Sequence, residues 1–111
     1  MQISPTAPAI ADFRALVTLT RVGAPLAPVI ATLDHAVQSL KAARPLLEQA
    51  HAAAAMLDAV DRAQGGAATL RNALAELQAN DGMTTFDQAF AADDASWDAN
   101  FAGWADALGV S

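Results

Sequence analysis

Apolar residues recur along most of this chain at intervals of three and four positions, which is the period of one face of an α-helix. β-branched residues are few, and no alternation of apolar and polar residues lasts beyond four positions, so strands are not predicted. We therefore expect an all-α fold: a small bundle of four or five helices in a single domain spanning residues 1–111.

Glycine and proline set the expected limits of the first two helices. Residues 1–7 are predicted to form an extended N-terminal segment, followed by a helix over 8–22 that Gly23 ends. The second helix begins near Pro25 or Pro28, where a missing N–H group is tolerated. It carries a heptad seam of Leu26, Ile30, Leu33, Val37 and Leu40.

Pro45 interrupts this second stretch. A proline inside a helix removes one hydrogen bond and crowds the preceding turn. The apolar positions after it are Leu46, Ala50, Ala53, Leu57 and Val60. On an ideal helix they are rotated by roughly 140° from the earlier seam. A break or sharp kink at Pro45 is the prediction, and one long helix touching different neighbours along its length is the alternative.

Gly65 and Gly66 form the plainest stop signal in the chain. The residues Ala67, Leu70, Leu74 and Leu77 form another heptad seam after them. A glycine pair between two such seams predicts the turn of an antiparallel helical hairpin.

The most informative pattern lies in residues 84–108, which are predicted to form one C-terminal helix. Thr84 or Thr85 can cap its first turn, and Gly109 closes it. Five of the six aromatic residues of the chain fall within an arc of about 60° on this helix. They are Phe86, Phe90, Trp97, Phe101 and Trp104, and we call them the aromatic stripe.

Two interpretations of the aromatic stripe stay open. In the first, it is the core-facing side of the last helix, since each ring can bury roughly 150–250 Å². In the second, part of it docks into a partner protein, with Asp87, Asp94 and Asp98 as an acidic rim. Aromatic anchors inside a polar rim are typical of binding hot spots. Both interpretations hold if the stripe packs against a second copy of the chain.

Composition and charge exclude several classes of function. The chain has 30 alanines, no cysteine and a net charge of −6. Without thiols there is no disulfide scaffold and no thiolate metal site. The last 40 residues hold seven acidic side chains and no basic one, a distribution that repels nucleic-acid phosphates. We expect no nucleic-acid binding, and no membrane span because no segment is apolar over roughly 20 residues.

The residues that could carry chemistry form no recognisable site. His35 and His51 follow no metal-ligand spacing. Asp93 and Asp94 would point about 100° apart on a helix, so they cannot share one proton. The pair Gly65–Gly66 lacks the lysine and hydroxyl residue of a phosphate loop. We therefore expect no catalytic residue, no bound metal and no cofactor, and do not predict an enzyme.

The sequence favours a non-catalytic helical assembly or adaptor module that binds itself or a larger protein complex through its C-terminal helix. Only 30 residues are large and apolar, and a core of that size often needs association for stability, so a homo-oligomer or a larger complex is expected. The alternative is an acidic, antitoxin-like inhibitor that occludes a basic surface of its target. A cytoplasmic location, or a place in a bacterial or phage assembly, is the accompanying expectation.

Overall fold

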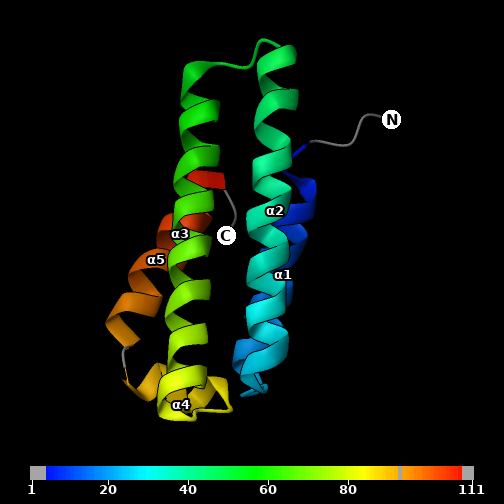
Figure 1. Ribbon diagram of the computed structural model, residues 1–111. Helices are drawn as coiled ribbons and strands as arrows, with labels where there is room; N and C mark the ends of the chain where they lie inside the picture. Colours follow the sequence, from blue (N-terminus) through cyan, green and yellow to red (C-terminus); the bar gives the residue numbers. More distant parts are fainter. Residues whose placement is uncertain (1–4, 93, 109–111) are drawn as a thin grey trace.

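Five helices make up most of the chain in the computed structural model, which describes residues 5–92 and 94–108 (Figure 1). They are α1 (Ala7–Arg21), α2 (Leu26–Gln49), α3 (Ala54–Asp81), α4 (Phe86–Ala92) and α5 (Asp94–Leu108). The predicted all-α bundle is confirmed. Residues 1–4 of the predicted extended segment lie outside the described residues, and Ala7 already belongs to α1.

Four long helices enclose the core, and the short α4 covers one end of it. In Figure 1, α2 and α3 form a long antiparallel pair, with their connecting turn at the top and α4 at the bottom. α1 packs along α2, and α5 packs along α3. α1 and α5 meet through Phe13, whose ring stacks on Phe101 with 4.3 Å between centroids. The core is therefore closed on all four sides.

α2 continues through Pro45 to Gln49, so the predicted break at Pro45 is wrong. The alternative of one long helix through both seams is also wrong, because α3 begins only at Ala54, after a turn. Its buried residues are Leu26, Val29, Leu33, Ala36, Val37, Leu40, Ala43 and Leu47. Their three- and four-residue spacing continues past the proline, because the next buried residue on this face is Leu47. Leu46, which the sequence assigned to the seam, is 52% exposed. Pro45 and Lys41 are also exposed, so water can bond the Lys41 carbonyl group that the proline leaves without a donor.

The sequence predicted the hairpin turn at Gly65–Gly66, and this prediction is wrong. The turn lies at residues 50–53, between α2 and α3. Here α2 ends in a Schellman motif, in which the N–H of Ala52 donates to the carbonyl oxygen of Leu47 at 3.0 Å. His51 takes the left-handed position of the motif, with φ of 57°. Histidine is one of the few residues besides glycine that are enriched in this conformation. The turn therefore carries no glycine that would mark it in the sequence.

Gly65 and Gly66 lie inside α3, because its apolar seam continues through them. The buried residues of α3 are Ala59, Val60, Ala63, Ala67, Leu70 and Leu74. A Cβ atom added at Gly66 would lie 3.3 Å from the backbone oxygen of Asn100 in α5, whereas one added at Gly65 would meet nothing within 4 Å. Gly66 therefore allows α5 to approach α3 closely, which is a packing role and not a turn.

The predicted C-terminal helix over 84–108 is two helices, since α4 ends at Ala92 and α5 begins at Asp94. In a continuous helix, Phe86 and Trp97 would stand about 16 Å apart along the axis. Their ring centroids are instead 4.6 Å apart, which requires the chain to change direction between them. Phe86 and Trp97 therefore pack against each other from two helices that run in different directions.

α4 begins with a capping box, as the threonines predicted. The N–H of Gln88 donates to Oγ1 of Thr85 at 3.3 Å, and Oε1 of Gln88 accepts from the N–H of Thr84 at 2.9 Å. Both contacts satisfy groups at the start of a helix that have no acceptor or donor within it. The short helix is therefore well defined at its first turn.

Two main-chain hydrogen bonds join the α1–α2 turn to the connection between α3 and α4. The N–H of Leu26 donates to the oxygen of Thr84 at 2.8 Å, and the N–H of Phe86 donates to the oxygen of Ala24 at 2.9 Å. Each bond supplies an acceptor for the first N–H group of a helix, α2 in one case and α4 in the other. We call this pair of bonds the loop bridge; it fixes α4 against the first half of the chain.

Separate substitution of the two glycines tests the position of the hairpin. Gly65→Ala is expected to raise the free energy of unfolding by about 0.5–1 kcal/mol, because alanine is the better helix residue and the space beside Gly65 is open. Gly66→Ala should give a smaller gain or a loss, because its methyl group presses on α5. Urea unfolding followed by circular dichroism measures both, and a clear loss for Gly65→Ala would indicate a turn there.

Candidate functional site

All six aromatic side chains of the chain form one continuous cluster. The rings connect in the order Phe90, Phe86, Trp97 and Phe101, and Phe13 contacts both Phe101 and Trp104. The centroid distances of these contacts lie between 4.3 and 5.6 Å, within the range where aromatic pairs attract. Phe13, the one ring outside the aromatic stripe, is therefore the residue of α1 that the stripe packs against.

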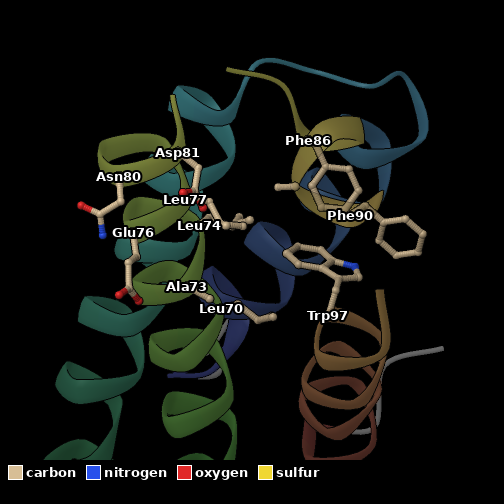
Figure 2. Close-up of a pocket in the computed structure, with 11 residues that line it drawn as sticks. Leu70, Ala73, Leu74, Glu76, Leu77, Asn80, Asp81, Phe86, Phe90 and Trp97 are labelled. Carbon is tan, nitrogen blue, oxygen red and sulfur yellow. The ribbon is translucent and has the colours of Figure 1, made fainter. Parts of the chain in front are cut away.

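One end of this cluster forms a wall of an apolar groove between α3 and the α4–α5 segment (Figure 2). The aromatic wall consists of Phe86, Phe90 and Trp97, with Ala89 between them. The opposite wall consists of Leu70, Ala73, Leu74 and Leu77 of α3, and the polar residues at its edge are Glu76, Asn80 and Asp81. The groove has a volume of about 380 Å³, within the range of ligand-binding pockets.

The groove exists because α5 lies close to α3 at only one end of their contact. Gly66 and Ala67 permit close approach at Asn100, but farther along α3 the seam carries leucines instead of small residues. In Figure 1, the N-terminal end of α5 lies away from α3. Figure 2 shows Leu74 and Leu77 facing Phe86 and Trp97 across the space that results.

The predicted aromatic residues divide between the groove and the core. Phe86, Phe90 and Trp97 line the groove, whereas Phe101 and Trp104 belong to the cluster behind it. Trp104 is 0% exposed, and Trp97 is 7% exposed. The core interpretation therefore describes most of the stripe, and of the three aromatic residues that line the groove only Phe90 is half-buried rather than buried.

The predicted acidic rim does not surround the groove. Asp87 lies on the other side of α4, so close to the α1–α2 turn that a Cβ atom at Gly23 would clash with its carboxylate. It lines a second, more open hollow of about 450 Å³ together with Arg21. Asp98 is exposed on α5 and does not line the groove, and the side chain of Asp94 lies outside the described residues.

Two acidic residues that the prediction did not assign to the site, Glu76 and Asp81, stand at the edge of the groove instead. Both are exposed. The sequence contained part of the information needed to find them, because the leucine seam of α3 was recognised and these acids lie beside it. It did not show the opposite wall, which depends on how α4 and α5 are placed against α3.

The ion pairs of the protein lie away from the groove. Asp34 pairs with Arg71 at 2.8 Å, and a hydrogen bond of 2.6 Å joins the side chains of Asp12 and His35. These contacts join α2 to α3 and α1 to α2, respectively. In contrast, among the described residues none of the acidic side chains after Arg71 makes an ion pair: Glu76, Asp81, Asp87, Asp98 and Asp106. The potential around the α3–α4–α5 end is therefore negative.

Comparison with protein-family models, with curated proteins and with solved structures finds no match to this chain. Within the described residues, no three side chains of His, Asp or Glu lie close enough together to hold a metal ion. No helix in residues 5–92 or 94–108 is both long and apolar enough to cross a lipid bilayer.

The two tryptophans distinguish the groove from the core. In a Trp104→Phe variant, fluorescence comes from Trp97 in the groove wall, and we expect acrylamide to quench it more strongly than the emission of a Trp97→Phe variant. Trp104→Phe should remain folded, because the buried indole N–H of Trp104 has no acceptor among the described residues and its removal offsets about 1–3 kcal/mol of lost packing. Equal quenching of the two variants would contradict this placement.

Proposed function

We propose that the protein is a non-catalytic helical module that joins a larger protein complex by binding a partner protein in the groove between α3 and the α4–α5 segment. The observation that carries this proposal is the apolar groove of about 380 Å³, whose edge holds carboxylates that no base of the described chain neutralises. Such a combination binds apolar side chains and attracts positive charge.

The partner presents a basic and apolar segment, and it is a different protein rather than a second copy. A second copy would bring another net charge of −6 to an end of the molecule that is already negative, and like charges oppose association. A segment with Lys or Arg would instead neutralise Glu76 and Asp81. Each bulky apolar side chain that enters the groove contributes roughly 1.5–3 kcal/mol when fully buried.

The side chains of the groove support binding better than catalysis. Its lining consists of aliphatic and aromatic residues with one amide and two carboxylates, Asn80, Glu76 and Asp81. Both carboxylates are exposed, whereas a catalytic acid or base is usually activated by burial or by a close partner. We further propose that the module acts in the cytoplasm or in a bacterial or phage assembly.

An acidic inhibitor that occludes a basic surface is the second candidate function. The observation that favours it is that unpaired acids continue beyond the groove, at Asp98 and Asp106 on the exposed side of α5. Binding through such a surface depends on charge and weakens strongly as salt is raised, because the Debye length falls from about 10 Å at 0.1 M to about 3 Å at 1 M. Binding through apolar contacts in the groove should persist at 1 M salt.

A pair of adjacent substitutions on α3 tests the proposed function. Leu77→Glu places a charge inside the groove, and Gln78→Glu adds the same charge to an exposed position that does not line it. We expect wild type and Gln78→Glu to be recovered from the native source in the same complex, and Leu77→Glu to be recovered free, with affinity reduced by about tenfold or more. Native mass spectrometry measures the composition of each complex.

Each other outcome of this experiment has a definite meaning. If Leu77→Glu stays in the complex while retaining its helix content, the groove is not the docking site. If wild type is recovered as a free monomer, the protein is not an assembly module. A complex made only of further copies of this chain would replace the proposed partner with self-association. Release of the wild-type complex by 1 M salt, where the Debye length is about 3 Å, would favour the inhibitor.

A further inference from the structure

We infer that the groove receives an amphipathic α-helix of about three turns from the partner protein, with its basic residues on the flank that faces α3. This inference rests on the proposed function and specifies the chemistry of the partner segment. The helix carries bulky apolar side chains at positions i, i+4 and i+7, which point into the groove.

The length of the occupant follows from the α3 wall. The residues of α3 that line the groove run from Leu70 to Asp81. With a rise of 1.5 Å per residue, they cover about 16 Å, or three helical turns. A helix lying along α3 in this groove would therefore contact it over about the same three turns.

The backbone of the groove walls favours a helical occupant over an extended one. Both walls are built from helices, in α3 and in the α4–α5 segment, whose own N–H and C=O groups bond within each helix. An extended segment would bring main-chain groups into the groove, where Glu76, Asn80 and Asp81 are the polar side chains that could bond them. Each buried main-chain group left unpaired costs about 1–3 kcal/mol. A helix satisfies these groups itself.

The spacing of the leucines sets the spacing of the anchors. Leu70, Leu74 and Leu77 stand four and three residues apart on α3; Leu70 and Leu74 are 3% and 5% exposed, and Leu77 is half-buried. Packed helices contact each other through side chains at three- and four-residue intervals, so the occupant presents apolar residues at the same intervals. Phe90 and Trp97 lie on the opposite wall and would contact these anchors from the other side. The fluorescence of Trp97 should therefore change when the occupant binds.

The charged edge sets the orientation of the occupant about its own axis. Both carboxylates of the groove belong to α3, at Glu76 and Asp81, and none belongs to the aromatic wall. The two positions are five residues apart, which corresponds to about 7.5 Å along the helix and about 140° around it. Asp81 therefore lies in line with the leucines at one end of the groove, and Glu76 lies to one side of them. A Lys or Arg on the flank that faces α3 would reach Glu76, and a second one at the end of the occupant would reach Asp81. Bases spread evenly around the helix would not be needed.

Three synthetic peptides of about 15 residues, long enough to form a helix on binding, test the inference. The first has Leu at i, i+4 and i+7 with Lys on one flank. The second has the same composition in an alternating order typical of a strand. The third replaces each Lys of the first by Glu. Anisotropy of a fluorescent label measures binding to the full chain, and we expect the first peptide to bind at least about tenfold more tightly than either of the others.

Variants of the protein locate the binding. Leu77→Glu should weaken the first peptide by about tenfold or more, whereas Gln78→Glu should change its affinity by less than about twofold. The double variant Glu76→Lys, Asp81→Lys should prefer the third peptide to the first, and both changes lie at exposed positions that leave the core intact. In a Trp104→Phe background, binding of the first peptide should reduce the quenching of Trp97 by acrylamide, because the occupant covers that side chain.

The outcomes separate this inference from the proposed function. Equal binding of the first and second peptides, or equal binding of the first peptide to wild type and Leu77→Glu, would overturn the helical occupant. The same holds if no peptide binds. If Leu77→Glu nevertheless releases the native partner, the proposed function stands and only the form of the partner segment is wrong. If the first peptide binds the groove but the native complex is unaffected, the proposed function fails instead.

Discussion

Contact between Phe13 and the rings of α5 joins the first helix of this chain to the last. Phe13 stacks on Phe101 and meets the edge of Trp104, and these contacts close the bundle between α1 and α5. In a chain with 30 alanines, each aromatic ring contributes far more buried area than the average core residue. The same cluster continues through Trp97 to Phe90, so the interaction that closes the core also builds one wall of the groove.

The periodicity of the apolar residues predicted the helices, but it did not predict the position of every turn between them. Gly23 adopts the left-handed conformation after α1, as expected, and Gly82 does the same at the end of α3. The turn after α2 escaped prediction because His51 occupies the same conformation without being a glycine. Conversely, Gly65–Gly66 suggested a turn because sequence alone does not distinguish a glycine needed for backbone conformation from one needed for close packing.

For the site, the sequence identified the aromatic wall but not the surface opposite it. Spacing on one helix shows which rings share a face, but the surface that this face meets depends on contacts between distant segments. The turn between α4 and α5 and the loop bridge from Ala24 to Phe86 both determine where the rings lie. For the same reason Asp87 was expected beside the groove, although α4 directs it toward Gly23.

The left-handed turn at His51 has a practical consequence for engineering. It connects the ends of α2 and α3 that are farthest from α4, at the top of the molecule in Figure 1. The residues around it are mostly exposed, and exposed loop tips are where inserted sequences are best tolerated. A reporter domain or purification handle inserted into this turn would project away from the groove, whereas one inserted near α4 would crowd it.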